Sequence, residues 1–270
     1  MKASKLHGAG NDFLLLDGGL EPELEERLPV LVARLCHRQM GVGGDGVLLV
    51  TPHRDGEAQV TYWNSDGSLA SFCANGTRCA ARFAAVKWGW SEMVLHTGFA
   101  AVPARVAGAQ VELGLPAPAA VHPWQELRVG GEDVRSRFLV VGVPHLVVPV
   151  AWPDFWTRPL DPLAPALRAH PDLPPGGANV TFVRVAKGAL HARSFERGVE
   201  GETLSCGSGD VAAGLVAVDA RWLEPPVAVV TASGRELRVT PEGPAPSCPV
   251  LLTGPAEWVA DLEIAPEMLA

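Results

Sequence analysis

One short sequence pattern occurs twice in this chain and constrains the fold more than any other feature. Cys73 and Cys206 are each followed by small residues, a glycine three positions on, and a run rich in alanine. Nine residues before each cysteine stands a side chain that binds polar ligands, Asn64 in the first copy and Arg197 in the second. The repetition predicts two similar halves, each with a helix that begins just after its cysteine and with a thiol at the start of that helix.

Composition bounds the class of protein. The chain has 270 residues, of which 47% are hydrophobic and 19% charged, so it has enough apolar side chains to bury a large core. Its net charge of −8 argues against binding to nucleic acid or to an anionic membrane, both of which require a basic face. No targeting segment and no apolar run of membrane-spanning length is visible, and the five cysteines have no zinc-ligand spacing. These features predict a cytoplasmic protein with reduced thiols and no bound metal.

Periodicity predicts many short strands and few helices. The proline-rich stretch Leu115–Ala120 is the best candidate for a link between domains. We therefore expect an N-terminal domain over residues 1–116, completed by a last strand within 262–270, and a C-terminal domain over 117–261. Helices are expected at 23–36, 74–88 (ended by Gly89) and 207–222, and strands at 13–17, 47–50, 59–63, 94–95, 101–106, 110–115, 137–143, 146–150, 178–185 and 190–195.

The position of each cysteine suggests a chemistry. The first N–H groups of a helix have no partner within the helix and attract anions, so a thiol placed there is expected to have its pKa lowered from about 8.5. The same N–H groups are suited to hold a carboxylate of a substrate. Two thiols on opposite faces of one α-carbon are able to remove a proton from one side and deliver another to the opposite side, which inverts the stereocentre. Cys36, Cys79 and Cys248 lack this context and are expected to be buried core residues.

A series of motifs carries a family resemblance. They are His7–Phe13, Gly41–Gly46, Asn64–Ser68, Cys73–Cys79, Gly177–Val180 and Glu196–Gly209. Together, and in this order, they resemble the diaminopimelate epimerases, in the wider group that includes the proline racemases. The resemblance implies an α+β fold of two pseudo-symmetric lobes, each a strand-rich, barrel-like sheet around a central helix, with the active site in the cleft between them.

The resemblance also implies an activity and the residues that carry it. The activity would be cofactor-independent epimerisation of LL-diaminopimelate to meso-diaminopimelate, a step in the formation of lysine and peptidoglycan precursors, by a homodimer. Cys73 and Cys206 would exchange the proton, with His145 and Glu196 assisting. The α-carboxylate would be held by the backbone of Ala74, Asn75, Gly207 and Ser208, and the far end of the substrate by Asn11, Asn64, Asn179 and Arg197.

Three residues depart from the usual family pattern, in which Ala74 is a glycine, Val143 an asparagine and Asp210 a small residue. Valine cannot replace the hydrogen bonds of an asparagine, and losing one polar contact changes discrimination by about 1–3 kcal/mol. Asp210 adds negative charge near Cys206 and is expected to raise the pKa of that thiol. These departures leave the predicted chemistry in place and leave the exact substrate open.

Alternative interpretations remain at this point. A racemase of the same group acting on another amino acid, an isomerase of the phenazine-pathway type, and a non-catalytic binding protein are the competing functions. The presence of both Cys73 and Cys206 argues against the phenazine-type isomerase. Arg78 and Arg82, on the helix after Cys73, are interpreted as a solvated or interface face.

Overall fold

The computed structural model describes residues 1–20 and 24–269, and it has the α+β class expected from the sequence. Contacts divide the chain into two compact units, Met1–Gly114 with Thr253–Ala270, and Leu115–Leu252. The first boundary lies at the start of the proline-rich stretch, two residues before the expected position. The C-terminal segment of the first unit begins at Thr253, whereas only residues 262–270 were expected to return to it.

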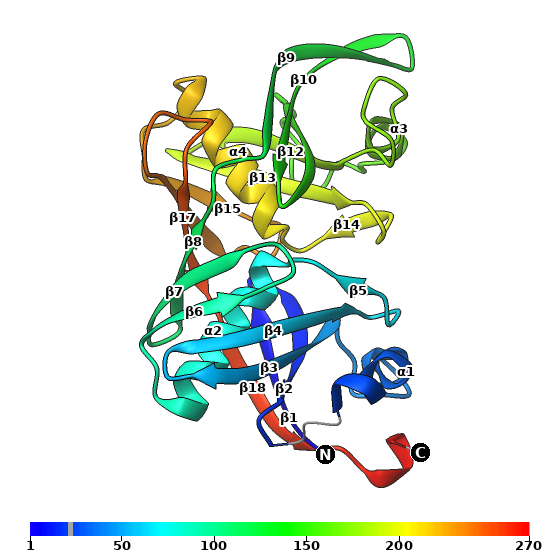
Figure 1. The fold of residues 1–270 in the computed structure, drawn as a ribbon. Helices are drawn as coiled ribbons and strands as arrows, with labels where there is room; N and C mark the ends of the chain where they lie inside the picture. The colour runs from blue at the N-terminus through cyan, green and yellow to red at the C-terminus, as the bar shows by residue number, and fades with distance from the viewer. Residues whose placement is uncertain (21–23, 270) are drawn as a thin grey trace. The chain divides into compact units, whose positions relative to one another are not determined.

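The first unit has one helix among its strands and a second helix beside them (Figure 1). Its strands are β1 (Lys2–Gly8), β2 (Asn11–Asp17), β3 (Gly46–Arg54), β4 (Glu57–Asn64), β5 (Leu69–Ala70), β6 (Glu92–His96), β7 (Ala101–Ala107), β8 (Gln110–Leu115) and β18 (Glu257–Glu263); its helices are α1 (Leu24–Cys36) and α2 (Ala74–Trp88), with a 3₁₀ turn, η1 (Pro266–Met268), near the C-terminus. Strand β17 (Val250–Pro255) crosses the boundary between the units.

The second unit has its own strands and helices. Its strands are β9 (Ala120–Val129), β10 (Glu132–Val141), β11 (Val143–Pro149), β12 (Asn179–Ala186), β13 (Ala189–Glu196), β14 (Gly201–Thr203), β15 (Val227–Val230) and β16 (Glu236–Pro241); its helices are α3 (Leu163–Arg168) and α4 (Gly207–Asp219).

The two units repeat one topology. In the first, β1 pairs antiparallel with β2, β2 parallel with β3, β3 antiparallel with β4, β4 parallel with β6, and β6 antiparallel with β7. In the second, β10, β11, β12, β13, β15 and β16 pair in the same order and the same directions. The outer pair β18–β1 corresponds to β9–β10, and the short strand β5 on β4 corresponds to β14 on β13. The internal repeat seen around the cysteines therefore extends over the whole of each lobe.

Each lobe wraps its strands around one central helix. Helix α2 packs against β1, β2, β3, β4, β6 and β7, and α4 packs against the six corresponding strands of the second unit. Helix α4 is apolar all round after its first turn and is buried from Gly207 to Ala217, as expected for a helix enclosed by a sheet. Gly214 is required for this close packing, because a Cβ there would lie 2.7 Å from the Cβ of Val239 in β16.

The other two α-helices pack outside the central helices, against the sheets. Helix α1 packs its buried leucines on β2 and β3, in a cluster that includes Leu28, Leu35 and Val47. Helix α3 packs with Phe138, Leu146 and neighbouring side chains of the second unit.

The expected helix after Cys73 is confirmed at both ends, and its C-terminal cap is Gly89 in the left-handed region (φ 79°). The helix after Cys206 ends at Asp219, three residues earlier than expected, since Arg221 has a positive φ (58°) and interrupts it. The expected C-terminal strand within 262–270 is wrong in extent, because β18 ends at Glu263 and a 3₁₀ turn follows. No helix in the described part of the chain is long and apolar enough to cross a membrane.

Candidate functional site

The expected site residues of the first unit gather at one end of its sheet. Asn11 begins β2, Asp45 immediately precedes β3, and Asn64 ends β4. Parallel pairing of β2 with β3 and antiparallel pairing of β3 with β4 bring these three positions to the same end of the sheet. The backbone N–H of Ser65 also donates to the Asp45 carbonyl (3.1 Å), which fixes the end of β4 beside the start of β3.

Cys73 is the N-cap residue of α2. Its backbone is extended (φ −144°, ψ 112°), its carbonyl accepts from the N–H of Thr77 (2.8 Å), and its Sγ accepts from the N–H of Gly76 (3.4 Å). The thiol is thus directed at the N-terminal N–H groups of the helix, as the sequence predicted. Ala74 and Asn75, the first two helical residues, are both buried.

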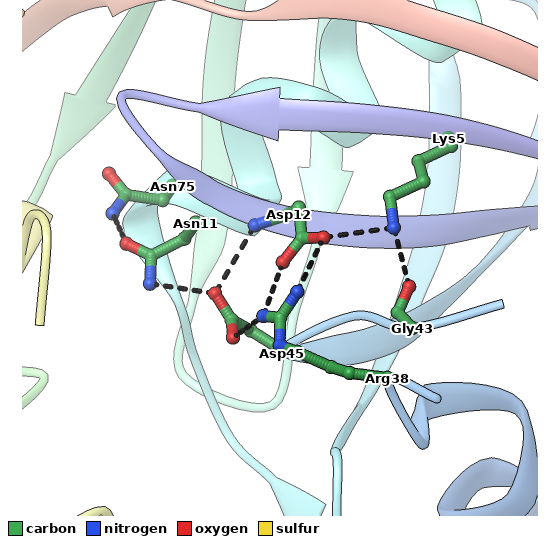
Figure 2. Close-up of polar contacts among 7 residues, drawn as sticks. All are labelled: Lys5, Asn11, Asp12, Arg38, Gly43, Asp45 and Asn75. Atoms are coloured by element: carbon green, nitrogen blue, oxygen red, sulfur yellow. Dashed lines mark hydrogen bonds and ion pairs between the residues drawn. The ribbon is translucent and has the colours of Figure 1, made fainter. Parts of the chain in front are cut away.

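A chain of side-chain hydrogen bonds ties α2 to the start of β2 (Figure 2). Asn75 Nδ2 donates to Asn11 Oδ1 (2.6 Å), and Asn11 Nδ2 donates to Asp45 Oδ2 (3.1 Å), which also accepts from the backbone N–H of Asp12 (3.2 Å). Asn11 and Asn75 therefore lie together, whereas Asn64 donates to Ser68 Oγ (3.0 Å) within its own turn.

Arg78 extends this chain, and its interpretation as an exposed side chain is wrong. Its exposed fraction is 0%, and its Nη2 donates to Asn75 Oδ1 (2.6 Å). Arg82, one turn further on, is half-buried. An arginine in an alanine-rich helix resembles a surface residue in sequence, and the packing of strands around α2 places Arg78 inside.

In the second unit, His145 lies in β11 beside Asn179 of β12. The histidine is fully buried, and neither ring nitrogen makes a hydrogen bond of normal geometry within the described residues. Burial and, to a lesser extent, the positive charge of Arg197 lower the pKa of His145 to about 3, although the backbone of Val141 opposes the shift. His145 is therefore neutral at physiological pH.

The residues at the end of β13 also meet the start of β12. Asn179 Oδ1 accepts from the backbone N–H of Arg197 (2.8 Å), and Thr203 Oγ1 of β14 donates to Glu196 Oε1. Asn179, Glu196 and Arg197 thus form one group beside His145. Thr203 is an additional member that the sequence did not single out.

Cys206 is the N-cap residue of α4 and has the same extended backbone as Cys73 (φ −116°, ψ 96°). Its carbonyl accepts from the N–H of Asp210 (2.8 Å), and its Sγ lies 3.8 Å from Ser208 Oγ. Gly207 and Ser208 begin the helix and are buried, so the backbone of the second helix N-terminus repeats that of the first, although Cys206 makes no side-chain capping hydrogen bond among the described residues.

The expectation of a lowered thiol pKa is wrong for Cys206. Burial raises the pKa of this thiol well above its usual value, and the negative charges of Glu196 and Asp210 raise it further. The N–H of Gly209 and the hydroxyl of Ser208 act in the opposite direction and do not compensate. The expected effect of Asp210 is confirmed. The other three cysteines are buried as expected.

Several groups that hold these residues were missed from the sequence. Asp45 lies within a glycine-rich motif that was used for the resemblance without a role being assigned. Lys5, Asp12 and Arg38 come from separate segments, and nothing in their local sequence signals that they meet. Within the described residues, no group of three or more His, Cys, Asp or Glu side chains is arranged to hold a metal ion.

Solved structures identify the class of fold. A phenazine biosynthesis protein of the PhzF family from Bacillus anthracis superposes with a TM-score of 0.71 at 14% identity, covering 98% of this chain and 99% of that one. A probable proline racemase from Agrobacterium radiobacter superposes with a TM-score of 0.70 at 17% identity, covering 100% of this chain and 95% of that one. The protein has the two-lobed fold of these two structures.

Sequence comparison narrows the class to one family. The family model described as diaminopimelate epimerase matches residues 3–95 and 137–259. A diaminopimelate epimerase from Archaeoglobus fulgidus is 37% identical over 256 residues, 86% of each chain, and one from Aquifex aeolicus is 37% identical over 252 residues, 88% of this chain and 89% of the other. The chain belongs to the diaminopimelate epimerase family.

Proposed function

We propose that this protein epimerises LL-diaminopimelate to meso-diaminopimelate, in lysine biosynthesis, with Cys73 and Cys206 as the two acid–base groups. The observation that carries the proposal is the equivalence of the two thiols. Each caps the central helix of its lobe, at the same place in a repeated topology. A single catalytic cysteine would need no such duplication, whereas inversion at carbon requires one proton acceptor and one proton donor on opposite faces.

The two helix N-termini suit the α-carboxylate of an amino acid. The first N–H groups of α2 and α4, at Ala74 and Asn75 and at Gly207 and Ser208, would donate to the carboxylate oxygens. Negative charge that develops on the carboxylate when the α-proton leaves would be stabilised by the same N–H groups and by the positive ends of both helices.

The proton transfer balances without a cofactor. The thiolate of one cysteine takes the α-proton, and the pair of electrons of the C–H bond is delocalised into the carboxylate. The thiol of the other cysteine then gives its proton to the opposite face of the α-carbon. Each turnover exchanges the protonation states of the two cysteines. After product release, loss of a proton to water from one thiol and uptake of a proton from water by the other thiolate restore them for the next substrate.

The environment of Cys206 supports its assignment as the proton donor in the resting protein. Burial and the charges of Glu196 and Asp210 keep this thiol protonated. Cys73 would then start as the thiolate, with the N–H of Gly76 directed at its sulfur. Glu196 and the neutral His145 would assist transfer at Cys206.

Asn11, Asn64, Asn179 and Arg197 would bind the far amino-acid end of the substrate. The planar guanidinium of Arg197 is suited to a carboxylate because it can donate to both oxygens. Val143 begins β11 and supplies no side-chain hydrogen bond, so the distal group would rely on the other polar side chains.

Deuterium uptake at the α-carbon tests the proposal across a panel of amino acids in ²H₂O. We expect rapid exchange with diaminopimelate and slow or no exchange with proline, lysine and ornithine. Exchange with another amino acid alone would favour a racemase of different specificity. No exchange with any of them would favour a binding protein on the same scaffold.

The resemblance also leads us to propose that the protein is a cytoplasmic homodimer. Light scattering coupled to gel filtration would then give twice the chain mass of 28.5 kDa. A mass of one chain at micromolar concentration would contradict the dimer and leave the reaction untouched.

A further inference from the structure

The side-chain hydrogen bonds of the first unit run from Arg78 through Asn75 and Asn11 to Asp45. The group at one end can only donate a hydrogen bond, and the group at the other end can only accept one. At one end, the guanidinium of Arg78 has only donors, so Asn75 Oδ1 must accept. At the other end, the carboxylate of Asp45 has only acceptors, so the group of Asn11 that faces it must be Nδ2. Between them, Asn75 Nδ2 donates to Asn11 Oδ1.

These two ends determine the orientation of both carboxamides. If the Asn11 amide were turned over, its oxygen would face the Asp45 carboxylate and its nitrogen would face the Asn75 nitrogen. Both contacts would then set like groups against each other, so the turned form loses two hydrogen bonds and gains two repulsions. The orientation of each asparagine is therefore set by its neighbours in the chain.

Asp45 is itself held from the other side (Figure 2). Arg38 donates to Asp45 Oδ1 (2.7 Å) and to both carboxylate oxygens of Asp12 (2.8 and 3.1 Å). Lys5 lies 2.9 Å from Asp12 Oδ2 and donates to the Gly43 carbonyl. Two cations thus hold two carboxylates at the start of β2 and β3, next to the residue whose amide they orient.

Burial raises the pKa of Asp12, but the hydrogen bonds from Arg38 and Lys5 outweigh it, and the net shift is downward. Asp12 therefore stays ionised and keeps Arg38 in place. The backbone of Asn75 is also held in place, by close packing against Gly8. A Cβ at Gly8 would lie 2.7 Å from the carbonyl oxygen of Asn75.

The second lobe provides an internal comparison. The register of the parallel pairs β2–β3 and β11–β12 makes Asn11 equivalent to Val143, and Asp45 equivalent to Ala178. Counting from the two N-cap cysteines, Asn75 corresponds to Ser208 and Arg78 to Val211. None of these four positions has the same residue type in both lobes, and three of the four residues in the second lobe are apolar. The first lobe has all four hydrogen-bonding residues and the second lobe has none of them, as expected if the four act together.

We propose that Asp45, held by Arg38, is a positioning residue that turns the Asn11 carboxamide so that it offers N–H, and not C=O, to the substrate. The proposal rests on the proposed function, in which Asn11 contacts the far end of the amino acid. An asparagine fixed in this sense recognises a carboxylate oxygen and repels an ammonium group. Asp45 would thus help to determine which group of the distal amino-acid end this lobe accepts.

The test is a double-mutant cycle between Asp45→Asn and Asn11→Ala, with kcat and KM measured for diaminopimelate. The amide introduced by Asp45→Asn has the same shape but can donate as well as accept, so only the contact with Asn75 still orients Asn11. We expect KM to rise about tenfold, with kcat changed less than about threefold. In the Asn11→Ala background the same change should have little further effect, because Asp45 acts through Asn11.

Asp17→Asn is the matched control, since it makes the same substitution at the other end of β2, where Asp17 Oδ1 accepts only from the nearby N–H of Gly19 among the hydrogen bonds described. Additive effects in the cycle, or an unchanged KM in Asp45→Asn, would overturn the proposal. If Asp45→Asn does not fold, Asp45→Ser takes its place in the cycle, because a hydroxyl can donate as well as accept and no longer forces Asn11 to donate. A wild-type protein that does not exchange the α-proton of diaminopimelate would instead contradict the proposed function.

Discussion

The buried histidine of the second lobe leads to a quantitative prediction about stability. His145 has no exposed surface, and its pKa is lowered to about 3 in the folded chain. In the unfolded chain its pKa is near 6.5. As the pH falls through 6.5, the unfolded state binds a proton that the folded state does not, so the folded state loses stability down to about pH 3.

The size of the effect follows from these two values. At pH 5 the solution is about 1.5 pH units below the pKa of His145 in the unfolded chain, so the histidine is protonated there, while His145 in the folded chain stays neutral. At 1.36 kcal/mol per unit, His145 alone should lower the free energy of unfolding by about 2 kcal/mol between pH 8 and pH 5. Replacing it by the neutral His145→Gln should remove that part of the pH dependence.

Urea denaturation followed by circular dichroism, at pH 8 and at pH 5, measures the effect in both proteins. Other titrating groups contribute equally to both and cancel in the difference between them. We expect the loss of stability on acidification to be about 2 kcal/mol smaller in His145→Gln, and unaffected by His53→Gln, which replaces an exposed histidine. Equal pH dependence in the wild type and His145→Gln, within about 0.5 kcal/mol, would refute this account of His145.

Two further predictions concern the second lobe. Asp210→Asn removes a negative charge that raises the pKa of Cys206, so the pH profile of Cys206 alkylation by iodoacetamide should shift to lower pH; an unshifted profile would contradict the proposed electrostatics. Gly177 has a positive φ (67°), and a Cβ there would lie 2.0 Å from the Arg168 carbonyl oxygen, so Gly177→Ala should lower stability by at least about 2 kcal/mol. Gly130→Ala is its control, since it shares the positive φ (61°) but meets no atom within 4 Å; equal thermal unfolding of the two variants would contradict the steric argument.

The parts of the fold that could be predicted from sequence are those set by local signals. The bounds of α2 were predicted because Cys73 and Gly89 stand at its two ends. Cys73 has an extended backbone before the first turn, and Gly89 has a left-handed backbone after the last. Strand β9 was missed because most of its side chains are exposed or half-buried, which leaves no clear alternation of apolar and polar residues. Helix α3 was missed because it lies in a proline-rich segment and is only six residues long.

In the candidate site, too, residues in local motifs were predicted and contacts between distant segments were not. The two cysteines and the asparagines were predicted because they lie in recognisable motifs. The partners that orient them were missed because they come from distant segments. Asp45 is 34 residues from Asn11 and reaches it only because β2 and β3 are parallel. The pKa of Cys206 was misjudged because helix position is visible in the sequence, whereas complete burial is not.

The central claim is that two thiols share the proton transfer. Cys73→Ser and Cys206→Ser, each assayed for epimerisation of diaminopimelate, test it most directly, with Cys248→Ala as a buried-cysteine control from the second unit. Because a hydroxyl is a far weaker acid than a thiol, the account predicts that each serine variant loses activity by about a thousandfold or more while the control stays near the wild type. Near-wild-type epimerisation by either serine variant would contradict the account.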